Sequence, residues 1–250
     1  MNRMFRGFRK VDAKIRRAIE LMAAQVLQTG ELILRDKNGV ALYRLEFGVK
    51  SSHFPTVADG WDDVDNRDPL ADLEGLAEVL RTDGKYDPDT LLFGRRALDY
   101  FLSDAKVQSR LDNRRISIGT VAPDHRGNGG TWQGDIWIGN YRFDFWSYSG
   151  RYKDPETGQS TPFLDDNSVT MLSSQAPLDL TYGAIPRIAG AENRVAPFMP
   201  ERMAMPEAGA DLSTYAWMTP DGKAIKGSAG TRPLPIPTAI DTFGTLTVVS

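Results

Sequence analysis

The chain has 250 residues, a formal net charge of −3 and no cysteine. The lack of cysteine excludes disulfides, thiolate nucleophiles and cysteine-ligated zinc or iron–sulfur sites. The small net charge gives no global attraction to nucleic acid or acidic membranes, and no apolar run approaches the roughly 18–20 residues that span a bilayer. The length is enough for a substantial core in one large or two smaller domains.

The amino-terminal segment is strongly basic. Its first seventeen residues hold one acid, Asp12, against these bases: Arg3, Arg6, Arg9, Lys10, Lys14, Arg16 and Arg17. A transit peptide or a nucleic-acid contact would have this composition, but the exposed face of a helix is the commoner cause. From Val11 onward apolar residues recur every three or four positions, which predicts a long helix that Gly30 ends.

A β-hairpin is expected after this helix, with strands over 32–35 and 40–47 joined at Asn38-Gly39, because this pair suits a tight hairpin turn. The polar stretch 48–67 contains His53 and an acidic group: Asp59, Asp62, Asp63 and Asp65. The group lacks the alternating oxygen ligands and closing glutamate of a calcium loop. We therefore expect 48–67 to be a solvated linker into a new domain.

The middle of the chain mixes helices and strands. Asp68-Pro69 predicts a helix start, with an N-cap before a first-turn proline, and Gly84 closes the helix. Its buried stripe is Leu70, Leu73, Ala77 and Leu80. The next expected elements are a strand over 90–93, helices over 95–102 and 103–111 with Ser103 as N-cap, and a strand over 116–121.

Two further strands are expected to be joined at Gly139-Asn140, a pair that suits the positive φ angles of a tight hairpin turn. After this turn Tyr141, Phe143 and Phe145 alternate with polar or amphipathic residues, which predicts a strand with two different faces. A further strand is expected over 169–172. Prolines interrupt 187–210, which we expect to run over the surface, before a strand over 212–218 and an extended piece over 233–237. A closing strand over 246–249 is expected to pair in the sheet begun by the 32–47 hairpin.

Two blocks, Tyr-Ser-Gly-Arg-Tyr at 148–152 and Phe-Leu-Asp-Asp-Asn at 163–167, precede an apolar strand. This arrangement resembles the lambda-type major head protein family of tailed phages, which has Tyr-Ser-Gly-x-Tyr followed by Phe-Leu-Pro-Asp-Asn. Asp165 stands where the family has proline. Further counterparts, in the same order, are 68–80, the charged helix over 103–115, Thr181-Tyr182-Gly183 and 246–249.

The resemblance implies the Hong Kong 97-like capsid fold, an α+β architecture with a long spine helix, a β-hairpin with a peripheral sheet, and a mixed α/β axial domain. It implies a peripheral domain at 1–63, an axial domain at 64–190 and a return to the peripheral domain over 191–250. The family's amino-terminal arm and extended loop before the spine helix have no counterpart here, so we expect that arm to be missing.

The resemblance also implies a structural subunit of an icosahedral phage head, a late protein that is not an enzyme, with no cofactor, metal or catalytic residue. Its partners would be copies of itself in hexamers and pentamers, with packaged double-stranded DNA inside. A decoration protein, a scaffold and a portal are further candidates, and no membrane is involved. The location would be the virion, and the host cytoplasm during assembly.

Two other functions stay open. A carbohydrate-active enzyme or binding module could use acids near the tryptophans: Asp144, Glu156, Asp165 and Asp166, with Trp132, Trp137 and Trp146. A nucleic-acid-binding protein could use the basic start. His53 and His125 show no triad or metal spacing, and the Gly-rich loop 125–130 is better explained as a hairpin tip than as an anion cradle.

Overall fold

The fold is described from a computed structural model, which covers residues 2–36, 38–111, 119–125, 129–154, 157–183, 212–218 and 225–249. The chain divides into two compact units. One contains Met1–Met22 and Asp179–Ile236, and the other contains Ala23–Leu178 and Pro237–Ser250. The expected surface stretch 187–210 and the start of the strand expected over 116–121 lie outside the described residues.

The predicted long helix is present as α1, Asn2–Thr29, and it begins nine residues earlier than expected. Arginine and lysine are good helix formers, and Phe8 continues the apolar stripe toward the amino terminus. The helix ends at Gly30 as predicted: its φ is +69°, and its N–H donates to the Val26 carbonyl at 2.8 Å. The bases at 6, 9, 10, 14, 16 and 17 are all exposed, which confirms that the basic start is a helix face.

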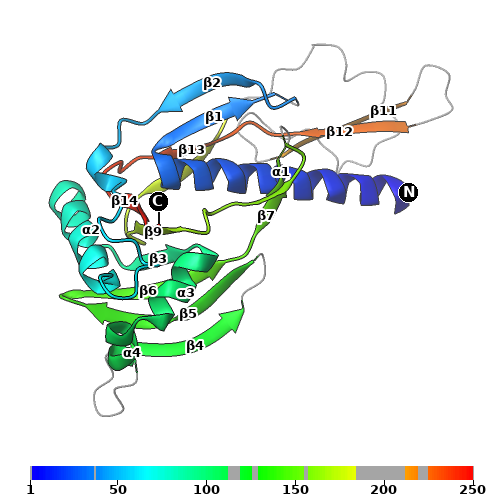
Figure 1. The fold of residues 1–250 in the computed structure, drawn as a ribbon. Coiled ribbons are helices and arrows are strands. Elements are labelled where there is room, and N and C mark those ends of the chain that lie inside the picture. Colours follow the sequence, from blue (N-terminus) through cyan, green and yellow to red (C-terminus); the bar gives the residue numbers. More distant parts are fainter. Residues whose placement is uncertain are drawn as a thin grey trace. The chain divides into compact units, whose positions relative to one another are not determined.

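A six-stranded sheet is the centre of the larger unit (Figure 1). Its strand order is β14 (Phe243–Thr247), β9 (Ser168–Leu172), β3 (Thr90–Phe93), β6 (Tyr141–Tyr148), β5 (Gly130–Ile138) and β4 (Gly119–His125). Only β3 and β6 run parallel; the other pairs are antiparallel. The predicted Gly139-Asn140 hairpin is confirmed by the β5–β6 pair, and Gly139 has a φ of +55°.

The predicted partner of the last strand is wrong. β14 pairs with β9, with Leu246 opposite Val169, and not with the hairpin near the amino terminus. A β-branched apolar strand matches any buried sheet position, so its own pattern does not select a partner. The pairing of β14 with β9 is a long-range contact, and it places the end of the chain beside residues 168–172.

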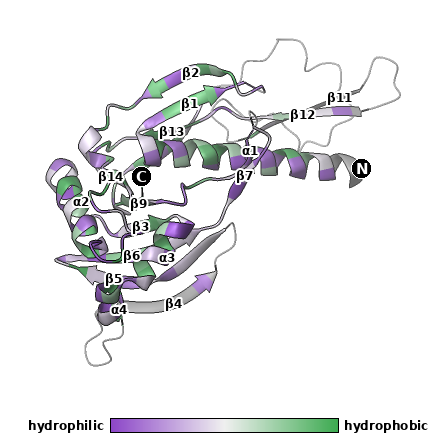
Figure 2. Ribbon diagram, in the orientation of Figure 1, coloured by the Kyte–Doolittle hydropathy of each residue, from purple (hydrophilic) through white to green (hydrophobic). Residues whose placement is uncertain are grey.

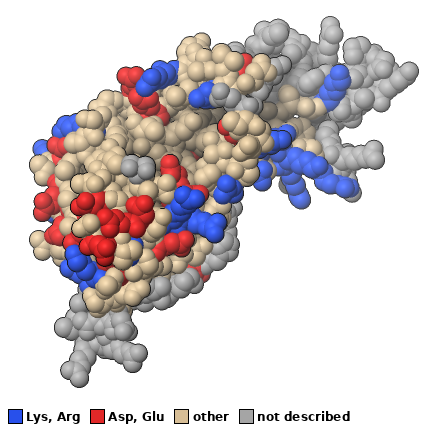
Figure 3. Space-filling model, viewed as in Figure 1, with Lys and Arg blue, Asp and Glu red and all other residues tan. Residues whose placement is uncertain are grey.

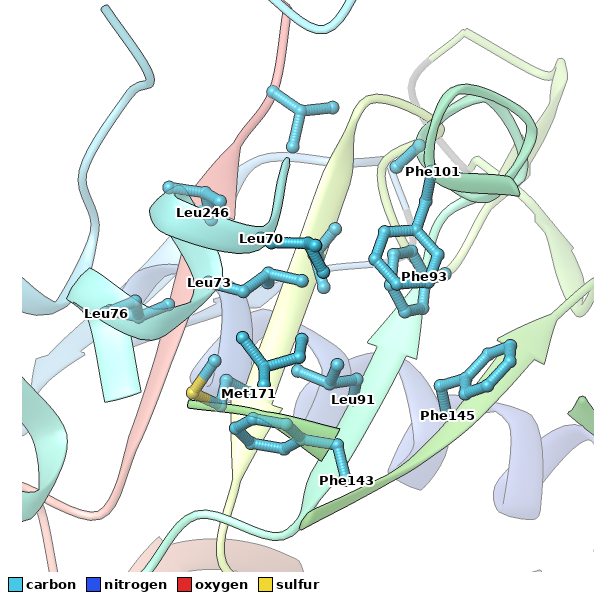
Figure 4. Close-up of a cluster of buried hydrophobic side chains, with 14 of the residues drawn as sticks. Leu70, Leu73, Leu76, Leu91, Phe93, Phe101, Phe143, Phe145, Met171 and Leu246 are labelled. Carbon is cyan, nitrogen blue, oxygen red and sulfur yellow. The ribbon is translucent and has the colours of Figure 1, made fainter. Parts of the chain in front are cut away.

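Helices α2 (Pro69–Gly84) and α3 (Arg95–Ser103) contribute, with this sheet, to one core (Figure 4). The predicted α2 stripe is confirmed, since all four of its residues are buried. Alternate residues of four strands face the helices: Leu91 and Phe93, Ile136 and Ile138, Phe143 and Phe145, Val169 and Met171. Phe101 of α3 lies 4.9 Å from Phe93 and 5.9 Å from Phe145 between ring centroids, so an aromatic cluster joins helix to sheet.

Four two-stranded sheets complete the described fold. They are β1 (Glu31–Arg35) with β2 (Ala41–Glu46), β7 (Arg151–Lys153) with β8 (Ser160–Pro162), β10 (Leu178–Tyr182) with β13 (Pro233–Pro237), and β11 (Ser213–Met218) with β12 (Ile225–Gly230). The first pair confirms the predicted Asn38-Gly39 hairpin. A short 3₁₀ helix, η1 (Ser51–His53), and α4 (Ala105–Leu111) are the remaining described helices.

The expected solvated linker at 48–67 is instead packed into the larger unit. His53 and Trp61 are fully buried, and Arg67 is 8% exposed. The segment covers the outer edge of β14, because Val57 N–H donates to the Thr247 carbonyl at 3.0 Å and Trp61 N–H to the Val248 carbonyl at 2.8 Å. Its few apolar residues are irregularly spaced and follow no helical or strand period, so the sequence pattern did not indicate burial.

Candidate assembly surfaces

The last turn of α1 is attached to the sheet unit by a glutamine. Gln28 Nε2 donates to the Phe163 carbonyl at 2.8 Å, and Gln28 Oε1 accepts from the Asp165 N–H at 2.9 Å. Thr245 Oγ1 of β14 donates to the Leu27 carbonyl at 3.0 Å. This carbonyl belongs to the last four of the helix, which have no partner within the helix. The turn at 163–165 and β14 therefore fix this end of α1.

The turn that receives Gln28 is itself held tightly. Asp165 Oδ1 accepts from the Asn167 N–H at 2.8 Å, an Asx-type turn, and the Asp166 carbonyl accepts from the Ala97 N–H at 2.9 Å. Gly94 lies against the same turn, and a Cβ placed on it would be 2.0 Å from the Asp165 carbonyl oxygen. Only glycine allows this close approach, so β3, the start of α3 and the turn are packed backbone to backbone.

A buried ion pair connects the 48–67 segment to the start of α4. Arg67 Nε lies 3.4 Å from Asp104 Oδ2, and both side chains are less than 10% exposed. Arg67 also donates to the Trp61 carbonyl at 2.9 Å. Asp104 Oδ1 accepts from the N–H groups of Lys106 and Val107, so Asp104 is the N-cap of α4 and the expected Ser103 cap is wrong by one residue. Both residues are acceptable caps by type, and Arg67 contacts both of them, since its Nη2 also donates to Ser103 Oγ at 3.2 Å.

A second charged cluster surrounds the buried His53. Asp83 Oδ2 lies 3.0 Å from His53 Nε2, and Asp83 Oδ1 lies 2.7 Å from Lys50 Nζ. The hydrogen bond from Lys50, then that from His53, lowers the pKa of the Asp83 carboxyl below its ordinary range. The cluster holds η1 against the carboxy-terminal end of α2, and His53 has a structural position rather than one in a solvated loop.

The acids proposed for sugar hydrolysis do not converge. Asp144 pairs with Thr90 at the start of β3, whereas Asp165 and Asp166 contact Gly94, just beyond its end. Thr90 and Gly94 are four strand residues apart, which corresponds to about 13 Å. This separation exceeds the ~5–10 Å that paired glycosidase carboxylates need. Glu156 lies outside the described residues. The structure thus gives the three described acids positions in strands and turns.

The tryptophans lie on β5 and β6 on the face opposite the core. Trp132 and Trp146 are directly opposite each other in the β5–β6 register, and Trp132 Nε1 donates to Asp144 Oδ1 at 3.3 Å. Trp137 is 43% exposed. The side chain of His125 and residues 126–128 of the Gly-rich loop are not among the described positions. Among the described residues, no three His, Asp or Glu side chains come together as a metal site, the acidic group at 59–65 included.

Two described surfaces stand out on the charge and hydropathy views. The exposed bases of α1 gather along the helix in Figure 3, and Asp12 is paired with Arg16 at 3.1 Å. The β1–β2 hairpin carries apolar residues on a strand that is exposed along its whole length, visible as green on β2 in Figure 2. Within the described ranges, no helix is both long and apolar enough to pass through a lipid bilayer.

Two solved structures, a prophage capsid protein and a phage-related protein, superpose on this chain. A chain described as the capsid protein of a prophage of E. coli CFT073 superposes with a TM-score of 0.68 at 18% identity, covering 94% of this chain and 64% of that chain. A phage-related protein from Bordetella bronchiseptica RB50 superposes with a TM-score of 0.50 at 13% identity, covering 96% and 66%. The chain thus spans about two thirds of the length of both structures. The α+β capsid fold predicted from the sequence is confirmed.

The family model described as phage major capsid protein E matches residues 1–248, and the chain belongs to that family. Among curated protein sequences, none matches the chain significantly. Family and fold together confirm the resemblance found in the sequence and define a shell-forming structural class. They give no support to the carbohydrate-active alternative or to a separate nucleic-acid-binding protein.

Sequence reasoning missed Gln28, Arg67 and Asp83, whose side chains hold the segments together. Each is an ordinary polar residue in its local sequence, with a partner at least 30 residues away. No spacing rule identifies such pairs. Asp104 could have been predicted as the N-cap from the sequence, because aspartate is at least as good an N-cap as the neighbouring serine.

Proposed function

We propose that this chain is the structural subunit of an icosahedral tailed-phage head, which assembles as hexamers and pentamers around double-stranded DNA. The observation that carries the proposal is the family match over residues 1–248 on a chain with a phage capsid fold. The role is structural, since a shell subunit needs matched surfaces and no reaction. The protein would act in the virion after assembly in the host cytoplasm.

We further propose a peripheral domain made of residues 1–63 and 191–250 and an axial domain of residues 64–190. The compact unit that combines Met1–Met22 with Asp179–Ile236 supports a lobe built from an early and a late segment, whereas residues 23–63 and 237–250 of the proposed peripheral domain lie in the larger unit. One strand crosses the proposed boundary, since β14 completes the sheet that β9 and β3 begin in the axial domain. Closed shells repeat heterologous contacts around their axes, so both domains would present surfaces to neighbouring copies.

Packaged DNA is the proposed partner of α1. At 100° per residue, Arg6, Lys10, Lys14 and Arg17 lie on one face of the helix, and Phe8, Ile15, Ile19 and Met22 lie on the opposite face. The bases are exposed, and the apolar residues with described burial on the other face are more covered. A basic helix face attracts phosphates without reading sequence. A scaffold, a portal and a decoration protein would complete the set of partners.

The experiment is expression of the chain with its neighbouring genes, followed by negative-stain electron microscopy. Closed shells, or rings of five and six subunits, are the expected result. Asp144→Ala is the matched control, because it removes an exposed carboxylate that the hydrolase alternative needs and should leave assembly at the wild-type level. A chain that stays monomeric with every scaffold, at concentrations where a comparable head protein assembles, would contradict the proposal.

A further inference from the structure

Strand β2 has an open edge. The hairpin is a two-stranded sheet in the described part of the chain, so β1 is the only strand paired with β2 there. The Phe47 N–H donates to the Gly30 carbonyl at 3.2 Å, and Leu32 lies opposite Leu45. Because hydrogen bonding alternates along an antiparallel strand, the main-chain groups of Phe47, Leu45 and Tyr43 point toward β1. Those of Arg44 and Glu46 therefore point to the open edge.

The same strand is unusually apolar for an exposed edge. All six residues of β2 are exposed, among them Leu42 at 59%, Tyr43 at 69% and Leu45 at 37%, and Val40 just before the strand is 60% exposed. Natural edge strands are generally protected by charged side chains (lysine above all), proline, bulges or a covering segment, because an open edge is a template for another strand. Arg44 and Glu46 are the charged residues of β2. No proline or lysine lies in β2, and its irregularity is confined to the Arg35 end of the hairpin.

We propose that β2 pairs antiparallel with β2 of a second copy, across a twofold axis at Leu45. This continues the hairpin into a four-stranded sheet with the order β1, β2, second β2, second β1. The partner is a second copy on the strength of the proposed function, since a shell subunit meets identical neighbours. A twofold contact is isologous: the same edge serves both copies, and the contact closes on itself.

Charge favours one register of this pairing over its neighbours. Within its own hairpin Arg44 already contacts Glu31 at 2.7 Å and Glu46 at 3.3 Å, so a contact with the second copy would add to these pairs. With the axis at Leu45, Arg44 lies opposite Glu46 of the second copy, and the same contact is repeated on the other side of the axis. Opposite charges directly across a strand pair are stabilising and like charges are destabilising. Moving the axis to Arg44 would place two arginines opposite each other, and moving it to Glu46 would place two glutamates opposite each other.

The other face of the pair agrees with this register. Tyr43 would lie opposite Phe47 of the second copy, and the two Leu45 side chains would meet at the axis. Aromatic pairs across strands add to the stability of a sheet. The outward main-chain groups of Arg44 and Glu46 fall opposite each other as a hydrogen-bonded pair, so the backbone permits the alignment that the side chains favour.

Disulfide trapping tests the register directly, because the chain has no cysteine. In Leu45→Cys the two introduced thiols would sit at a non-hydrogen-bonded pair with Cα atoms about 4.5 Å apart, within the range of a disulfide. In the control Tyr43→Cys the two thiols would be about 14 Å apart, too far to bond. Mild oxidation of the assembled full-length chain should convert Leu45→Cys to a covalent dimer and leave Tyr43→Cys monomeric. Equal yields from the two variants, or no dimer from Leu45→Cys, would overturn the proposal.

A mixing experiment separates contact between copies from a role within one hairpin. Arg44→Glu and Glu46→Arg, each added to Leu45→Cys, should lose the disulfide dimer when oxidised alone, since like charges then face each other. An equal mixture of the two should regain it, because each variant supplies the charge that the other needs. Failure of the mixture to exceed the single variants would overturn the proposal. Shells that form without the disulfide dimer would contradict this contact but not the proposed function. A disulfide dimer without shells would contradict the proposed function but not this contact.

Discussion

The Gln28 side chain holds the Asp165 backbone at 2.9 Å, and through it the end of the 28-residue helix is attached to a turn 137 residues later in the chain. The same side chain donates to the Phe163 carbonyl, so one amide uses both its donor and its acceptor on a single turn. Together with the hydrogen bond from Thr245 of β14 to the Leu27 carbonyl, this contact attaches the end of α1 to the larger unit.

Replacing Gln28 by methionine should lower the free energy of unfolding by about 1–3 kcal/mol. Methionine keeps the length of the side chain but leaves the Phe163 carbonyl and the Asp165 N–H without this partner, and each lost hydrogen bond is worth about 1 kcal/mol. Urea unfolding followed by tryptophan fluorescence measures the change. Gln25→Met, on the same helix, is the control and should shift the free energy by less than about 0.5 kcal/mol.

Asp165→Pro restores the residue that the family pattern has at this position, yet we expect it to destabilise this chain. Proline has no N–H to donate to Gln28 and no carboxylate to accept from Asn167. The expected loss is about 1–3 kcal/mol in free energy of unfolding. Asp165→Ala removes only the side-chain acceptor and should cost less than Asp165→Pro. A proline variant as stable as wild type would show that the Gln28 contact contributes nothing.

Arg67→Met should be among the more destabilising single substitutions in the larger unit, by about 3–5 kcal/mol. It leaves the Asp104 carboxylate buried without its cation, 3.4 Å from where the guanidinium was. Thermal unfolding, checked by circular dichroism, measures the loss. Adding Asp104→Asn to Arg67→Met removes the unpaired negative charge at residue 104 and keeps a good N-cap residue for α4. The double variant should therefore recover part of the stability. A double variant worse than the sum of the two single changes would contradict this account.

Stability should fall below about pH 4, partly because of Asp83. Its pKa is lowered by the hydrogen bond from Lys50 and then by that from His53, so the unfolded chain binds a proton at this group first as the pH falls. The contribution is therefore fully present above the ordinary pKa of aspartate and is lost as the pH drops through the lower folded value. Asp83→Asn should be less stable than wild type at pH 7 and should lose less stability on acidification.

Urea midpoints at a series of pH values from 7 to 3 test this prediction. Asp62→Asn, an exposed acid outside the cluster, is the control and should keep the wild-type pH profile. If Asp83→Asn and wild type lose stability in parallel, the acid dependence comes from other carboxylates.

Replacing Arg6, Lys10 and Arg17 together by glutamine should weaken binding to double-stranded DNA, and the plot of log affinity against log salt should become shallower by about three. The reason is that each phosphate contact releases a counterion. Fluorescence anisotropy with a labelled duplex at several salt concentrations measures the slope. The control replaces Lys85, Arg95 and Arg96, three exposed bases of the larger unit, by glutamine. This control changes the net charge by the same amount. Equal slopes for both triple variants would show that the bases of α1 do not contact DNA.

Local patterns predicted the elements well where a residue acts through its own conformation. Asn38-Gly39 and Gly139-Asn140 both mark real hairpins, and Gly30 does end the long helix, because these residues need or favour particular turn geometry wherever they occur. The same reasoning failed for His53 and Trp61, which are polar or isolated in the sequence but buried by segments far along the chain.

The family resemblance could also be read from the sequence, because blocks such as 148–152 and 163–167 keep their order and spacing. Of the two candidate assembly surfaces, the basic face of α1 could be predicted from the sequence, but the open edge of β2 could not. The open edge of β2 depends on which strands find partners, and a sequence pattern that predicts a strand does not say whether a second neighbour will cover it.

The sequence by itself determined a long amphipathic helix with a basic face, two tight hairpins and an α+β chain of the capsid type. Their causes are local: helical period, turn geometry and the charge of neighbouring residues. Only the tertiary structure decided that β14 pairs with β9, that Gln28 attaches α1 to the Asp165 turn and that Arg67 pairs with Asp104. Those choices follow from the packing of segments more than thirty residues apart, where burial and mutual hydrogen bonding, rather than intrinsic preference, set the free energy.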